Sequence, residues 1–88
     1  MNTSRIIIWT NPVAPFQKLY VMKDGILIEQ MGIQVDDVPD IVFELAQKHE
    51  IQEIHFSGTR SYAEKIAEDL REQSVFKYNL PLNISIVI

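Results

Sequence analysis

The hydrophobic positions in the first third of the chain fall into three runs with the character of β-strands. Arg5–Thr10 (RIIIWT) is continuously apolar and rich in β-branched residues, which predicts a central strand covered on both faces. Two prolines among the next five residues end this run, because proline cannot join a strand ladder. Lys18–Lys23 and Ile26–Ile33 are joined at Asp24-Gly25, whose residues tolerate the positive φ angles of a tight hairpin. The three runs therefore predict an antiparallel meander.

Helical spacing follows in the middle of the chain. Asp36, Asp37 and Asp40 surround a proline, and this pattern predicts the start of a first helix. Carboxylates at that position satisfy free N–H groups and the positive end of the helix dipole. The helix is expected to end near His49–Glu50. Its apolar stripe, at i, i+3, i+4 and i+7 spacing, consists of Val38, Ile41, Val42, Leu45, Ala46 and His49.

The stretch Ile51–Glu72 predicts a buried strand, a tight turn and a second helix. The strand is short, apolar and bounded by Gly58. Ser61 and Glu64 have the spacing of a capping box, in which a hydroxyl and a carboxylate bond free N–H groups at the helix start. The apolar face of this helix is expected to consist of Tyr62, Ala63, Ile66, Ala67 and Leu70.

The C-terminal part of the chain predicts one further strand, Leu82–Ile88. Before it, Gln73–Pro81 carries Val75, Phe76 and Tyr78, which need a place to pack. The order of elements is thus β-β-β-α-β-α-β. Right-handed crossovers then predict a five-stranded mixed sheet in the order 3-2-1-4-5, with the second strand antiparallel to the rest. We expect an α/β fold in a single domain over residues 1–88.

Composition restricts the classes of function. The net charge of −4 argues against a general nucleic-acid binder, which normally carries a basic face. The chain has no cysteine, so disulfides and thiolate metal sites are excluded. The longest apolar run falls far short of the roughly 20 residues that span a bilayer. A soluble cytoplasmic protein is the resulting expectation.

The order of elements resembles the core of the ribonuclease H-like superfamily, which includes Holliday-junction resolvases, transposase cores and the halves of actin-like ATPases. The resemblance covers nearly the whole chain and lies in topology rather than in motifs. It implies three acids for a two-metal nuclease site: one in the first strand, one at the end of the fourth, and one in a helix after the fifth, a position beyond Ile88. The matching segments, Ile7–Asn11 and His55–Gly58, contain no carboxylate.

The actin-like branch of that superfamily has a glycine-rich phosphate turn after its first strand. The corresponding loop here reads NPVAPF and has no glycine. The resemblance therefore implies a minimal version of the fold that is not an enzyme and has no catalytic residues, cofactor or metal. Such a compact module would suit an accessory protein of a phage or mobile element.

The best candidate for a ligand site is the turn between the fourth strand and the second helix. An anion, nucleotide or nucleic acid could bind there through free N–H groups, hydroxyls and an arginine, at the sheet edge where open α/β folds bind ligands. The alternative is a capped helix with a surface arginine. The residues concerned are Ser57, Gly58, Thr59, Arg60 and Ser61.

Other polar groups have a simpler interpretation. Asp36, Asp37 and Asp40 match no calcium-loop pattern and are expected to cap the first helix. His49 and His55 have no evident partner for catalysis, and His49 suits the end of a helix for reasons of dipole alone.

The aromatic residues are expected mainly in the core, with a stacking platform for bases as the alternative. Nucleic acid is not the favoured partner, because the basic residues are scattered among acids. The residues weighed for such a platform are Trp9, Phe16, Tyr20, Phe56, Tyr62, Phe76 and Tyr78.

The last strand supplies the favoured functional hypothesis. In the predicted order it lies at the edge of the sheet, and a long, uncharged, apolar edge pairs readily with another chain. We therefore expect a small protein-interaction or assembly module that binds itself or another protein through its sheet. The alternative is a cover formed by the second helix or by Gln73–Pro81. The interface residues would be Leu82, Ile84, Ile86, Val87 and Ile88.

Overall fold

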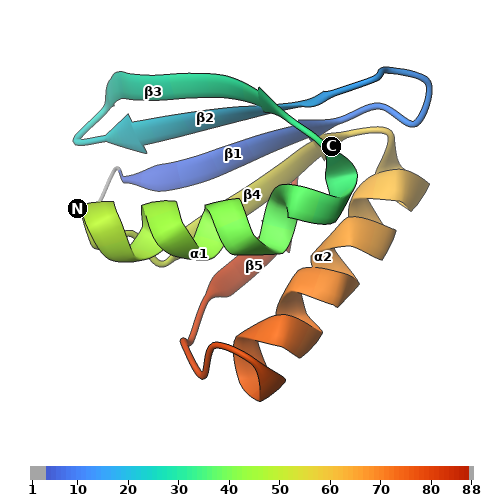
Figure 1. The fold of residues 1–88 in the computed structure, drawn as a ribbon. Helices are drawn as coiled ribbons and strands as arrows, with labels where there is room; N and C mark the ends of the chain where they lie inside the picture. The colour runs from blue at the N-terminus through green and yellow to red at the C-terminus, as the bar shows by residue number, and fades with distance from the viewer. Residues whose placement is uncertain (1–3, 88) are drawn as a thin grey trace.

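The computed structural model describes residues 4–87, and the elements within them follow the predicted order (Figure 1). The strands lie close to their expected positions, while the second helix is longer than expected. In chain order the elements are β1 (Arg5–Thr10), β2 (Gln17–Lys23), β3 (Ile26–Ile33), the 3₁₀ turn η1 (Val35–Asp37), α1 (Val38–His49), β4 (Glu53–Gly58), α2 (Arg60–Phe76) and β5 (Asn83–Ile86).

The strands form one mixed sheet in the order β3-β2-β1-β4-β5, which confirms the prediction. β2 is antiparallel to β1 and β3, whereas β1, β4 and β5 run parallel to one another. The β2–β3 hairpin turns at Asp24 and Gly25, with φ of 52° and 79°. The pairing shifts register between Val21 and Met22, so that Ile28 is an extra residue in β3.

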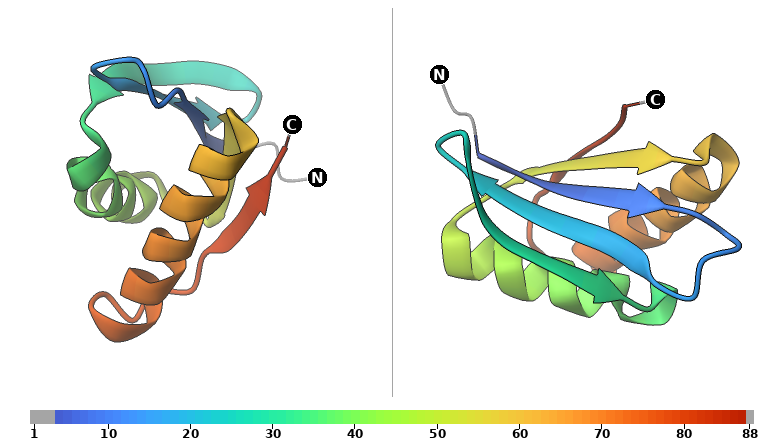
Figure 2. Two further views of the ribbon diagram at one scale, coloured as in Figure 1. Left: turned by 90° about the vertical axis from the view of Figure 1, so that its right-hand side faces the viewer. Right: turned by 90° about the horizontal axis from the view of Figure 1, so that it is seen from above.

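Both helices cover the same face of the sheet, which makes the molecule a two-layer structure (Figure 2). The core lies between the two layers. Burying each large apolar side chain there stabilises the fold by about 1.5–3 kcal/mol. The largest fully buried apolar side chains are Phe43, Phe56, Ile6, Ile8, Leu19, Ile51, Ile54 and Leu70.

No element within residues 4–87 covers the other face of the sheet, which corrects the expectation that β1 is covered on both sides. In β1, Ile6, Ile8 and Thr10 are fully buried, but Ile7 and Trp9 on the opposite face are only half-buried. We call this second surface the open face. Its residues, by strand alternation and register, are Arg5, Ile7, Trp9, Lys18, Tyr20, Met22, Leu27, Gln30, Gly32, Glu53, His55, Ser57, Asn83 and Ser85.

The start of α2 differs from the predicted capping box. Thr59 is the N-cap, it has no side-chain cap bond, and its carbonyl accepts the first helical hydrogen bond, from Ala63, at 2.8 Å. Ser61 is therefore already inside the helix and is not the N-cap residue of a capping box. The Glu64 carboxylate instead accepts a bond from Arg60 Nε at 3.1 Å.

The end of α2 also differs, because the helix continues to Phe76. Val75 and Phe76 were expected to need packing, yet Phe76 is 86% exposed and Val75 is exposed as well. Tyr78 does pack, with its ring stacked on Phe43 at a centroid distance of 4.0 Å, and Leu80 beside it also packs against the core.

The start of α1 is partly as predicted. Pro39 lies in the first turn, and Glu50 ends the helix in a left-handed conformation with φ of 57°. Asp37 is the N-cap residue, but its side chain makes no cap hydrogen bond. The aspartates near this helix start therefore act through charge rather than through a capping bond.

Gly58 joins β4 to β1 at closer range than any other residue type allows. Its φ is +96°, and a Cβ atom at this position would lie 2.1 Å from the carbonyl oxygen of Thr10. The same carbonyl accepts the N–H of Thr59 at 3.0 Å, and the Thr10 hydroxyl donates to the Ser57 carbonyl at 2.8 Å. These contacts fix the turn between β4 and α2 against the end of β1.

We expect Gly58→Ala to lower the free energy of unfolding by roughly 2 kcal/mol or more, because left-handed strain and overpacking each cost about 1–3 kcal/mol. The control is Gly32→Ala, whose Cβ would come no closer to another residue than 3.4 Å, to Phe16 Cβ. We expect this control to change stability by less than about 0.5 kcal/mol. Urea denaturation measures both, and equal stability of the two variants would contradict the Gly58 contact.

Candidate functional site

The predicted anion site, Ser57–Ser61, lies where expected, between β4 and α2 at the carboxyl end of the parallel strands. Most of its groups already have partners within the chain. Gly58 and the Thr59 N–H pack against Thr10, and the Arg60 side chain is paired with Glu64. The groups that remain for an anion are the free N–H groups in the first turn of α2, because no side chain caps them.

The predicted interface on β5 is less open than the sequence suggests. Leu82, Ile84 and Ile86 are half-buried against the core, whereas Val87 is 56% exposed. Ile88 lies outside the described residues. A guanidinium nitrogen of Arg71 reaches from α2 to the Ile84 carbonyl at 3.4 Å. This edge is thus only four residues long and is partly covered by α2.

The opposite edge, β3, is longer and was missed from the sequence. It spans eight residues, and Ile26, Leu27 and Ile28 are all exposed at its hairpin end. Glu29 is the one charged residue in the strand, and its carboxylate is bound to α1. The segment ILIEQMGI contains a single charged residue. Central strands are equally poor in charge, so this feature alone does not identify an exposed edge.

Glu29 joins β3 to the end of α1. Its carboxylate lies 2.5 Å from His49 Nε2 and 3.7 Å from Lys48 Nζ. The hydrogen bond from His49, with a smaller electrostatic contribution from Lys48, lowers the pKa of Glu29 below its ordinary value. Lys23 Nζ donates to the His49 carbonyl at 3.0 Å in the same region. These contacts are structural, because they connect the sheet to a helix end.

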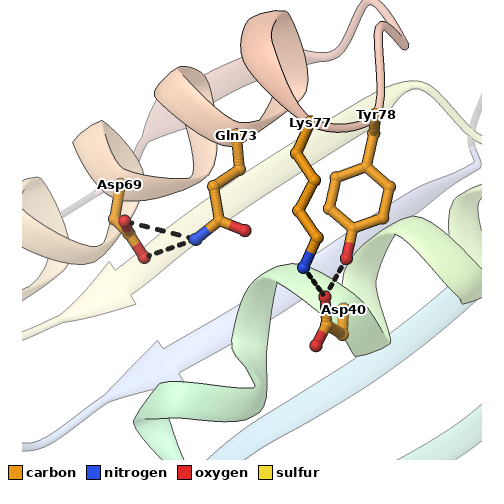
Figure 3. Close-up of polar contacts among 5 residues, drawn as sticks. All are labelled: Asp40, Asp69, Gln73, Lys77 and Tyr78. Atoms are coloured by element: carbon orange, nitrogen blue, oxygen red, sulfur yellow. Dashed lines mark hydrogen bonds and ion pairs between the residues drawn. The ribbon is translucent and has the colours of Figure 1, made fainter.

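The three aspartates near α1 do not form a metal site. Lys77 Nζ and the Tyr78 hydroxyl both reach Asp40 from the end of α2, the lysine at 3.3 Å (Figure 3). Among residues 4–87 no group of three acid or histidine side chains is arranged to hold a metal ion. Asp40 therefore connects the start of α1 to the segment after α2.

A groove of about 500 Å³ lies beside the open face, between β2, β3 and the loop before β2. The loop is well ordered by hydrogen bonds: the Asn11 N–H donates to Gln17 Oε1 at 2.7 Å, and Gln17 Nε2 donates back to the Asn11 carbonyl at 3.2 Å. This arrangement holds Phe16 over Gly32. The lining residues are Ala14, Pro15, Phe16, Lys18, Tyr20, Gln30, Met31 and Gly32.

His55 and the aromatic residues divide between the two faces of the sheet. His55 lies on the open face, 3.8 Å from the Glu53 carboxylate. Trp9 and Tyr20 are also on the open face, and Phe56 is in the core. Alternate residues of Arg5–Thr10 lie on opposite faces of the sheet. Both sets are apolar, so the sequence does not show which set is buried.

No protein-family model matches the sequence, and no curated protein matches it either. Within the part of the chain that the structure describes, no helix is both long enough and apolar enough to cross a membrane.

We expect the Glu29–His49 contact to make stability depend on acid. Because the pKa of Glu29 is lower in the folded chain than in the unfolded chain, its contribution is complete above the ordinary value of 4.5 and is lost as the pH falls through the folded value. Glu29→Gln should therefore flatten the acid side of the stability profile. Urea denaturation at a series of pH values measures this.

The matched control for Glu29→Gln is Glu44→Gln, on the exposed face of α1. It removes the same charge without an ion pair and should keep the wild-type dependence on pH. An unchanged acid profile in Glu29→Gln would contradict the assignment.

Proposed function

We propose that this chain is a non-enzymatic protein-interaction module that self-associates by pairing an edge of its sheet with the same edge of a second copy. The observation that carries the proposal is the unpaired outer side of β3, an apolar edge strand of eight residues. Edge strands that lack guarding charges add readily to another strand.

β3 supports this role better than β5. It is twice as long, and its exposed residues Ile26, Leu27 and Ile28 present no charge to a partner. The irregular pairing near Met22 twists only the hairpin end, so that Glu29–Ile33 continues as regular strand. The Glu29 carboxylate is paired with Lys48 and His49 within the chain, so the β3 edge itself presents no unpaired charge to a second copy.

Kinship with the ribonuclease H-like superfamily and residence in the cytoplasm belong to the same proposal. The sheet order 3-2-1-4-5 supports the kinship, and the lack of acids at Ile7–Asn11 and His55–Gly58 supports a non-enzymatic role. A cysteine-free chain suits a reducing compartment. A monomeric chain would use the same edge of β3 to pair with a strand of a different protein.

We expect size-exclusion chromatography with light scattering to give the mass of a dimer or larger assembly that dissociates on dilution. Ile28→Lys should yield a monomer, because an edge lysine opposes strand pairing. Val75→Lys, an equally apolar-to-charged change on exposed α2, is the control and should leave the mass unchanged. If Val87→Lys gave a monomer and Ile28→Lys did not, the interface would be at β5 rather than at β3. A wild-type chain that is monomeric at every concentration would refute self-association.

The alternative is an anion or nucleotide site at Ser57–Ser61, supported by the uncapped first turn of α2. Glu64 competes with any anion for Arg60, since the two side chains lie 3.1 Å apart. We therefore expect phosphate to raise the melting temperature of wild type and Arg60→Ala equally. A larger rise in wild type, lost in Arg60→Ala, would favour the alternative, and a thermal-shift titration distinguishes the two results.

A further inference from the structure

The open face carries aromatic side chains on neighbouring central strands. Trp9 of β1 pairs with Lys18 of β2, and Tyr20 pairs with Ile7, so that Trp9 and Tyr20 are diagonal neighbours on one surface. Such neighbours lie roughly 7–8 Å apart. Because both helices cover the opposite face, neither ring is covered by a layer of the fold (Figure 2).

Several polar groups on this surface have no hydrogen-bond partner in the described part of the chain. Among residues 4–87, the side chains of Trp9, Tyr20 and Gln30 make no hydrogen bond. Trp9 and Tyr20 are half-buried and Gln30 is exposed, so all three groups are accessible from solvent. The indole N–H, the phenol and the amide are thus available to a ligand that offers both donors and acceptors.

The groove on the same face has matching chemistry. Phe16, which is 51% exposed, and Tyr20 provide aromatic walls, and Gln30 provides an amide that can donate and accept. Lys18 is the only charged residue in the lining. A nucleotide matches this set of groups, because its base can stack on the aromatic rings and bond the amide while its phosphate contacts Lys18.

Charge is unevenly distributed despite the net value of −4. Nine of the twelve acidic residues, but only five of the eight basic ones, lie in η1, in the helices or at the helix C-caps, so this layer carries the whole excess of negative charge. The open face carries Arg5 and Lys18 against the single acid Glu53, which accepts a hydrogen bond from Asn83 and lies near His55. The Lys18 ammonium lies 5.5 Å from the centre of the Trp9 ring, so a cation and a stacking surface adjoin.

We propose that the open face binds single-stranded nucleic acid. Bases stack on Trp9, Tyr20 and Phe16, the Gln30 amide bonds base edges, and Lys18 contacts phosphate. A duplex is excluded as the ligand because its bases are stacked on one another and cannot reach aromatic rings on a flat sheet. This site is separate from the outer side of β3 and goes beyond the proposed self-association.

Trp9 is the only tryptophan, so its emission reports directly on the open face. We expect oligo(dT) or oligo(U) of about 16 nucleotides, a length that covers one small binding domain, to quench it at low salt. Labelled oligonucleotides should show a matching rise in anisotropy. With two cations on the surface, the affinity should fall with salt with a log–log slope near −1.4, at about 0.7 for each phosphate contact.

Two variants test the individual contacts on exposed positions, where folding is not at risk. Phe16→Ala should weaken binding about fivefold to 100-fold, since stacking contributes on that scale per base. Lys18→Gln should make the salt slope shallower by about 0.7. The controls on the other layer, Phe76→Ala and Lys65→Gln, should bind as wild type does.

Four results would each overturn the proposal. They are an absence of quenching and anisotropy change at low salt, equal binding of duplex and single strand, binding of a free mononucleotide such as UMP but not of the oligonucleotide, and Phe16→Ala binding as tightly as Phe76→Ala. Trp9 emission that changes with protein concentration alone would show that a second copy covers this face. Repeating the titration with Ile28→Lys separates that result from association through β3.

Discussion

The handedness of two chain crossovers determines the rest of this structure. The connections from β3 to β4 and from β4 to β5 both step in the same direction across the sheet, and each carries one helix. Right-handed crossovers that step in one direction place their helices on one face. The hydrophobic core therefore lies on one side of the sheet only, between the sheet and the helices, and the other side is the open face.

A one-sided core makes the joints between elements important. The helices are anchored by a few specific contacts: Gly58 against Thr10 at the start of α2, Glu29 with His49 at the end of α1, and Asp40 with Tyr78 between the two helical segments. All three join segments far apart in the sequence. They compensate for a sheet in which β3 and β5 have neighbours on one side only.

The sequence predicts the sheet order because its strand and helix patterns are strong and crossover handedness is nearly invariant. It does not predict the covering of β1, since Ile7 and Trp9 are as apolar as their buried neighbours Ile6 and Ile8. The capping box fails because the Thr10–Thr59 hydrogen bond fixes where α2 begins, and that contact is visible only in three dimensions. The continuation of α2 to an exposed Phe76 is likewise contrary to hydrophobic pattern.

The candidate surfaces show the same limit. The strand-to-helix turn was found from local signals, yet Arg60 turned out to be paired with Glu64. The edge at β5 was found from its composition, yet Arg71 reaches it from a distant helix turn. The groove beside Phe16 depends on how one loop lies on β3, and the sequence gives no indication of that placement.

The separation of charge between the two layers has a consequence for how the molecule moves near other charged bodies. The helices, η1 and the helix C-caps together carry nine acidic and five basic residues, whereas the open face carries two basic residues and one acid, so negative charge is displaced toward the helical layer. In the field of a polyanion it rotates so that the strands face inward before contact. A protein that is acidic as a whole can thereby approach a negative surface in one preferred orientation.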